Sequence, residues 1–107
     1  MSPAELEMAL IEHPSIEDAA VVGINLSTGE RPRAYIKVAE HAHGTLSPAD
    51  VQEWIKPRIA RHKALVGGVV LVPEIPKLMS GKIQRKVLRQ WAERDLKAME
   101  GDEKARL

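Results

Sequence analysis

The residues best able to do chemistry lie between Pro76 and Lys86, where basic side chains surround the pair Ser80-Gly81. Lys82 follows this pair directly, and an amphipathic basic pattern typical of a helix begins just after it. A lysine carries a compact, mobile positive charge, and the free N–H groups at the start of a helix attract anions. The order of these residues predicts a site for a carboxylate or a phosphate, with Lys82 as its charge. A plain helix start with a solvated lysine fits the same residues, so local physics leaves both interpretations open.

The pair Gly81-Lys82 also matches the end of a phosphate-binding P-loop, the Walker A pattern. That pattern needs Ser or Thr after the lysine and a second glycine five positions before the Gly-Lys pair. Ile83 and Pro76 occupy those two positions, so a P-loop is excluded.

Basic residues recur along the same stretch in a way that would suit a phosphate backbone: Lys82, Arg85, Lys86, Arg89 and Arg94. A nucleic-acid surface needs strong positive charge, and usually aromatic side chains that stack on bases. The net charge is only +1 and 3% of residues are aromatic, which favours a solvated helix face and predicts no nucleic-acid partner. His41-Ala42-His43 has no evident third ligand nearby, so no metal site is predicted.

Composition restricts the class of protein further. The 107 residues are the length of one domain, and 44% are hydrophobic, enough for a modest core. The lack of cysteine excludes disulfides, thiolate catalysis and cysteine-bound zinc. No apolar run approaches the roughly 18 residues of a membrane span, and Met1-Ser2-Pro3 does not begin a signal peptide. We expect a soluble protein of the cell interior, cytoplasmic unless a targeting signal directs it elsewhere.

The first half of the chain predicts a helix followed by two strands. Ser2-Pro3-Ala4-Glu5 is a capping-box pattern that starts the helix, and His13-Pro14 ends it. A helix so close to residue 1 predicts that the natural polypeptide extends upstream. An apolar strand is expected over 16–24 and an alternating strand over 33–39, joined as a β-hairpin by a long loop at 25–30.

The second half adds two helices and one strand. Ser47 caps the first of these helices, and Pro57 is expected to stop or kink it. A short buried strand follows at 69–72, then the last helix at 83–99 and a charged, flexible tail at 101–107. The pattern predicts a small α+β domain, with a β-hairpin plus a short mixed sheet flanked by about three helices.

The stretch around Lys82 resembles a family signature. The run Glu74-Ile75-Pro76-Lys77, then Ser80-Gly81-Lys82-Ile83 with Arg85 and Lys86, is similar to the C-terminal motif of the adenylate-forming acyl-CoA synthetases. This family includes 4-coumarate, medium-chain fatty acyl and acetyl-CoA ligases and firefly luciferase. Upstream segments match in order and spacing, so the resemblance covers the chain to about Leu96: Ser2 to Glu7, His13 to Gly23, Arg31 to Tyr35, and Leu46 onward. Ser-Gly-Lys-Ile favours the CoA ligases over peptide-synthetase adenylation domains, which usually have Asn-Gly-Lys.

The resemblance implies that residues 1–107 are the C-terminal lobe of an ATP-dependent acyl/aryl-CoA ligase (AMP-forming). In such enzymes a carboxylic acid and ATP form an acyl-adenylate, and the lobe then rotates so that CoA can form the thioester. Lys82 would be the adenylation lysine, with Ser80 and Gly81 as substrate-binding residues beside it. ATP and Mg²⁺ would be held mainly by the chain's own N-terminal lobe. That lobe and the hinge would lie before Met1, so the chain alone should be inactive.

Three further expectations concern CoA binding, an alternative function and the location in the cell. The resemblance assigns Lys63 a weak contact to CoA. The family's loop there commonly reads Tyr/Phe-Lys-x-Pro, whereas this one reads His62-Lys63-Ala64-Leu65-Val66, which weakens the assignment. The alternative function is a free-standing binding module on the same fold, using its basic helix for an acidic partner. Ala105-Arg106-Leu107 resembles the peroxisomal address Ser-Lys-Leu, although chance explains three residues equally well.

Overall fold

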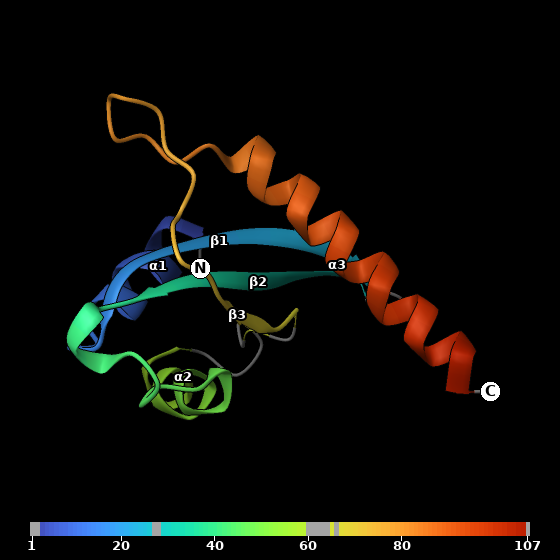
Figure 1. The fold of residues 1–107 in the computed structure, drawn as a ribbon, viewed down its shortest axis with the longest axis horizontal. Helices are drawn as coiled ribbons and strands as arrows, with labels where there is room; N and C mark the ends of the chain where they lie inside the picture. The colour runs from blue at the N-terminus through green and yellow to red at the C-terminus, as the bar shows by residue number, and fades with distance from the viewer. Residues whose placement is uncertain (1–2, 27–28, 60–64, 66, 107) are drawn as a thin grey trace.

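The centre of the protein is a three-stranded mixed sheet. The structure, a computed structural model, describes residues 3–26, 29–59, 65 and 67–106. The strand order is β1-β2-β3 (Figure 1). β1 (Ile16–Leu26) pairs antiparallel with β2 (Gly29–Val38), and β3 (Val69–Leu71) pairs parallel with β2. The predicted α+β class, with a β-hairpin and a short mixed sheet, is confirmed.

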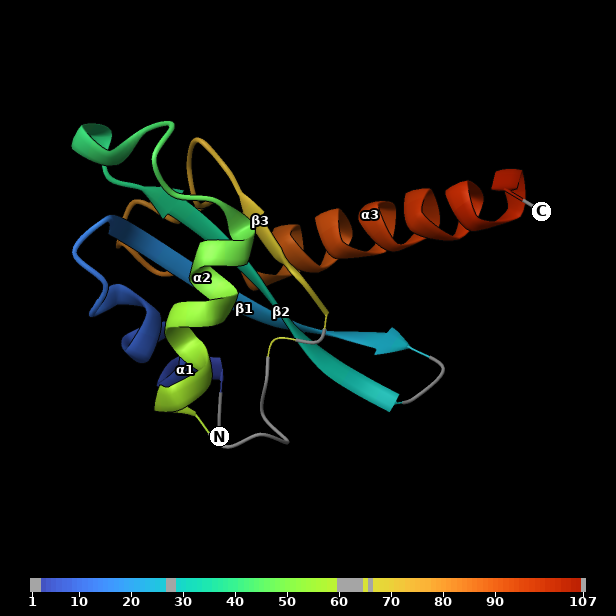
Figure 2. The ribbon, with the colours of Figure 1, turned by 90° about the horizontal axis from the view of Figure 1, so that it is seen from below.

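Helices cover both faces of this sheet. α1 (Pro3–Ile11) and α2 (Pro48–Ile55) pack on one face, and α3 (Arg85–Arg106) packs on the other (Figure 2). The predicted alternation of β2 explains this arrangement, because Ile36 belongs to the first buried cluster and Tyr35 to the second. No helix in the described part of the chain is long and apolar enough to cross a membrane.

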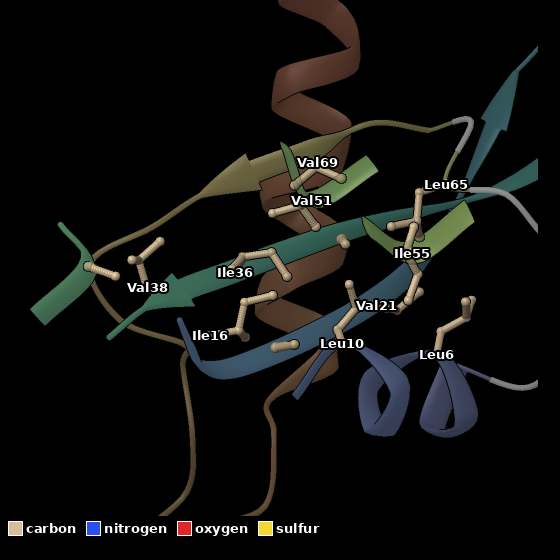
Figure 3. Close-up of a cluster of buried hydrophobic side chains, with 13 residues drawn as sticks. Leu6, Leu10, Ile16, Val21, Ile36, Val38, Val51, Ile55, Leu65 and Val69 are labelled. Atoms are coloured by element: carbon tan, nitrogen blue, oxygen red, sulfur yellow. The ribbon is translucent and has the colours of Figure 1, made fainter. Parts of the chain in front are cut away.

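The larger buried cluster joins α1 and α2 to the sheet (Figure 3). Leu10, Ile36, Val51 and Ile55 are all at most 1% exposed. Burying such a side chain contributes roughly 1.5–3 kcal/mol relative to leaving it in water. Aliphatic side chains therefore supply most of the core, as expected from a sequence with one tyrosine, two tryptophans and no phenylalanine.

The predicted start and end of α2 are both confirmed. Ser47 accepts a hydrogen bond from the Asp50 amide (3.1 Å), and the Asp50 carboxylate accepts one from the Ser47 amide (3.0 Å). These two bonds complete a capping box. The α-helix ends at Ile55, and the short 3₁₀ helix η2 (Lys56–Arg58) contains Pro57.

Two predicted boundaries are wrong. A long loop was expected at 25–30, but Asn25 pairs with Glu30 and Leu26 with Gly29, so these four residues belong to the strands. The antiparallel ladder thus continues well past the body of the sheet. The last helix begins at Arg85 and runs to Arg106, although the sequence pattern predicted 83–99. The backbone of 101–106 is helical, while the predicted flexibility of this tail stays a prediction. The expected cap at Ser2 lies outside the described residues.

A buried polar network fastens α3 to the sheet. The guanidinium of Arg33, only 8% exposed, donates to the Gly67 carbonyl (2.7 Å), to Asp95 (3.0 Å) and to the Tyr35 hydroxyl (3.2 Å). The Tyr35 hydroxyl in turn donates to the same Asp95 oxygen at 3.0 Å. Among the described residues, no buried side-chain nitrogen or oxygen lacks a partner. The network satisfies a charge that would be costly to bury alone.

Candidate functional site

Lys82 lies at the tip of a small hairpin, which we call the Lys82 hairpin (residues 76–84). A bridge joins Lys77 and Ile83, and the Gln84 amide donates to the Pro76 carbonyl at 2.9 Å. The Leu78 amide donates to the Lys82 carbonyl, also at 2.9 Å. The segment leaves the end of the sheet and extends away from the body of the domain before α3 begins (Figure 1). Backbone bonds therefore hold Lys82 out from the surface.

This geometry corrects the expected position of Lys82. The sequence pattern put the lysine directly before the last helix, with the helix starting at residue 83, but the helix begins only at Arg85. The Gln84 carbonyl accepts the first helical bonds, from the amides of Val87 (3.1 Å) and Leu88 (3.3 Å). Two residues, Ile83 and Gln84, therefore separate Lys82 from the first residue of the helix. Ser80 lies five residues before Arg85, too far from the start of α3 to cap it.

Gly81 allows the hairpin to turn. Its amide donates to the Leu78 carbonyl at 2.8 Å, which closes a four-residue turn, and its φ is +90°. Side chains other than glycine rarely adopt this backbone conformation. A Cβ atom at this position would meet nothing within 4 Å. The requirement for glycine is thus set by the backbone and not by lack of space.

On the role that the family resemblance implies for Lys82, we expect Gly81→Ala to weaken adenylate formation while leaving the fold intact. A non-glycine residue with positive φ costs on the order of 1–3 kcal/mol, and this hairpin is local and exposed, so it would leave its present shape before the domain unfolds. A cost of 1–2 kcal/mol corresponds to a loss of roughly 5- to 30-fold. ATP–pyrophosphate exchange by the full-length enzyme measures the rate, and the thermal midpoint should barely move. An unchanged exchange rate would show that the turn is not needed.

The surroundings of Lys82 are cationic and open. The side chain is exposed, and no carboxylate within the described residues lies at ion-pairing distance from its ammonium. An open hollow of about 500 Å³ is lined by Gly81, Lys82, Ile83, Arg85 and Arg89. Three of these five residues are basic and none is acidic. The hollow can therefore attract an anion, and Lys82 is free to move toward it.

The turn also exposes apolar surface. Leu78 is 50% exposed and Met79 is fully exposed, directly before Ser80. Large exposed apolar side chains at the end of a projecting loop are typical of a surface that contacts another protein region. The tip thus combines a free cation with two apolar side chains.

Ion pairs fix both ends of the Lys82 hairpin. Lys77 pairs with Asp18 of β1 (2.5 Å), which gives this lysine a structural role. Arg85 forms two hydrogen bonds with the carboxylate of Glu7 in α1 (2.8 and 2.9 Å). These bonds raise the pKa of Arg85, although burial acts against them. Sequence reasoning missed both acids. The available signal for Glu7 was its place between Leu6 and Leu10 in the apolar stripe of the first helix.

Lys63 and the histidine pair His41 and His43 are the remaining residues that the sequence singled out. Lys63, the residue assigned to CoA, lies outside the described residues, so its role stays a prediction. His41 and His43 lie in the 3₁₀ helix η1 (Glu40–Ala42) and just after it. The described residues contain no group of three or more His, Cys, Asp or Glu side chains that could hold a metal ion.

A family model identifies the class of domain to which this fold and the Lys82 hairpin belong. The family model described as "AMP-binding enzyme C-terminal domain" matches residues 5–82, which is most of the chain and ends at Lys82 itself. The chain belongs to this family. The resemblance deduced from the Pro76–Lys86 stretch is thereby confirmed.

Individual relatives agree with this assignment. An acyl-CoA ligase, ppsA, of Aspergillus oryzae is 42% identical over 92 residues, covering 84% of this chain and 16% of the relative. A benzoate CoA ligase from Burkholderia xenovorans is structurally similar, with a TM-score of 0.72, 34% identity and coverage of 83% and 18%. ATP-bound MatB from Rhodopseudomonas palustris has a TM-score of 0.76, 25% identity and coverage of 84% and 18%. The chain spans about one sixth of the length of its curated relatives.

Proposed function

We propose that this chain is the C-terminal lobe of an ATP-dependent acyl- or aryl-CoA ligase and that Lys82 is its adenylation lysine. The observation that carries the proposal is the free, exposed ammonium of Lys82 on a hairpin fixed at both ends by ion pairs. Family membership and the short span relative to its relatives support a role as one lobe of a larger enzyme. On this proposal the chain alone is inactive.

The first half-reaction brings two anions together. A carboxylate oxygen attacks the α-phosphorus of ATP and forms the acyl-adenylate. The bond between the α-phosphorus and the oxygen that bridges the α- and β-phosphates breaks, and pyrophosphate leaves. Negative charge gathers on the phosphoryl oxygens in the transition state. A lysine placed there is worth several kcal/mol in a closed site because it stabilises developing charge. Lys82 supplies this charge, while Ser80 and Gly81 lie beside the substrate.

The second half-reaction needs a different surface of the lobe. The CoA thiol attacks the acyl carbonyl of the adenylate, forming the thioester and releasing AMP. Rotation of the lobe between the two steps withdraws Lys82, which is a form of conformational gating. Lys63 then contacts the phosphates of CoA. The large N-terminal lobe is the partner in both states and holds most of the ATP with its Mg²⁺.

The test of the proposed function is ATP–pyrophosphate exchange by the full-length protein across a panel of carboxylic acids, followed by CoA thioester formation with the best acid. At least one acid should support exchange that requires ATP, and residues 1–107 alone should support none. A full-length protein that exchanges pyrophosphate with no acid in a broad aliphatic and aromatic panel would contradict the proposal.

We also propose Ala105-Arg106-Leu107 as a peroxisomal address. The observation is its small-basic-leucine pattern, which receptors read at a chain end. Fusing the last ten or so residues to a fluorescent reporter should direct it to peroxisomes, and Arg106→Glu in the same fusion should abolish this. A diffuse cytosolic signal from the unmodified fusion would exclude the address and leave a cytoplasmic location.

A further inference from the structure

The carboxylate of Glu7 is a buried acid that the proposed chemistry does not use. Glu7 is only 6% exposed, and hydrogen bonds within the protein take the place of water around its carboxylate. It accepts a hydrogen bond from the Val21 amide at 2.7 Å and two from the guanidinium of Arg85 at 2.8 and 2.9 Å. Arg85 also donates to the Val21 carbonyl at 3.0 Å. The three residues form a closed unit, which we call the Glu7–Arg85 clamp.

The clamp occupies the outer edge of the sheet. β1 is the first strand in the order β1-β2-β3, so within the described residues one side of it has no strand partner. Val21 lies opposite Ala34, whose own amide donates to Gly68 on the other side of β2. The Val21 N–H and C=O groups therefore point outward, where a neighbouring strand would bind them. Glu7 takes the place of the missing acceptor, and Arg85 takes the place of the missing donor.

This edge is also where both ends of the Lys82 hairpin are attached. Arg85 is the first residue of α3 and lies three positions after Lys82. At the other end, Lys77 pairs with Asp18 on the same strand. The carboxylate of Glu7 binds Arg85 in the two-bond geometry that fixes direction as well as distance. The direction in which the hairpin leaves the domain is thus set at β1.

We propose that Glu7 and Arg85 are positioning residues for the adenylation step, holding the Lys82 hairpin at the angle that delivers the lysine to the reacting phosphate. The proposal rests on the proposed role of Lys82. Without the clamp, Lys82 is still present and charged, but its position relative to the reacting phosphate is less well defined. A displacement of about 1 Å at a reacting group can cost 100-fold in rate. Thioester formation takes place after Lys82 has withdrawn, so it does not depend on this angle.

The test compares the two half-reactions in the full-length enzyme. Arg85→Ala should lower the kcat of adenylate formation by roughly 10- to 100-fold, with little change in the KM for ATP. Thioester formation from supplied acyl-adenylate should stay within about twofold, since the rotation removes Lys82 from that step. Arg85→Lys keeps the positive charge but cannot form the same pair of hydrogen bonds with Glu7. Its rate of adenylate formation should therefore lie between those of Arg85→Ala and the wild type. Lys86→Ala removes the neighbouring exposed charge and should change neither half-reaction.

Glu7→Gln provides a second test in case the Arg85→Ala enzyme does not fold. Glu7→Gln keeps an acceptor for the Val21 amide but removes the charge that orients Arg85, so it should show the same selective loss in a folded enzyme. Equal loss of both half-reactions in these variants, or an Arg85→Ala enzyme that behaves like Lys86→Ala, would overturn the positioning role.

Lys82→Ala, assayed alongside, separates the two proposals. If that variant forms adenylate normally, the proposed function itself fails. If it does not, and Arg85→Ala does, only the positioning role fails.

Discussion

We expect Lys82→Ala to lower the rate of adenylate formation by roughly 100- to 1,000-fold in the full-length enzyme, the usual cost of removing one preorganised charge or donor from a transition state. The variant should fold normally, because the Lys82 side chain is exposed and only its backbone takes part in the hairpin. ATP–pyrophosphate exchange with a saturating acid measures the loss. Thermal unfolding of wild type and variant should coincide.

A matched control separates site chemistry from net charge. Lys86→Ala removes an equally exposed lysine four positions away and should leave exchange within about twofold, as expected for a charge outside the site. Lys82→Arg keeps the charge with a broader, planar head group and should recover only part of the rate, because arginine and lysine are not interchangeable at a point contact. A Lys86→Ala loss as large as that of Lys82→Ala would contradict a specific role for Lys82.

We expect Asp95→Ala to destabilise the 107-residue chain by about 2–3 kcal/mol, the range for leaving a buried charged group without its partner. The guanidinium of Arg33 would keep its bonds to Gly67 and Tyr35 but lose the only carboxylate that the structure shows beside it. Urea unfolding should give a lower midpoint with an unchanged slope. Glu93→Ala, an exposed acid on the same helix, should change the midpoint little.

The same contact predicts loss of stability in acid. Burial by itself would raise the pKa of Asp95, but the hydrogen bonds from Arg33 and Tyr35 and the charge of Arg33 outweigh it, so this pKa lies below its ordinary value. A lowered pKa in the folded state stabilises the protein above the unfolded pKa of about 3.9. That contribution is lost as the pH falls below about 4 and through the folded pKa. Asp95→Asn should flatten this pH dependence of the urea midpoint, and an equally steep dependence in that variant would exclude Asp95 as its source.

Much of the fold could be predicted because its signals are local. The alternation along β2 places Ile36 and Tyr35 on opposite faces, and the two buried clusters confirm it. Ser47 and Pro57 act on their own helix, so the limits of α2 followed from single residues. The hairpin at 25–30 was misjudged because turn-forming residues such as Asn25 also fit the end of a two-stranded ladder.

The candidate site could be predicted in identity but not in geometry. The residues around Lys82 identified the family. The sequence pattern nevertheless started the last helix at residue 83, inside the hairpin, and did not predict the hairpin itself. The turn closed by Gly81 and the bridge from Lys77 to Ile83 delay the start of α3 to Arg85. The Glu7–Arg85 clamp could not be foreseen, because its two residues are 78 positions apart and meet only once both pack beside β1.

We propose that Lys82 acts in the first half-reaction and not in the second. The most direct test gives the Lys82→Ala enzyme preformed acyl-adenylate and CoA, and measures single-turnover thioester formation beside single-turnover adenylate formation. We predict a loss of roughly 100-fold or more in adenylate formation, with the thioester rate within about twofold of wild type because the lysine is withdrawn in that step. An equal loss in both half-reactions would contradict the claim.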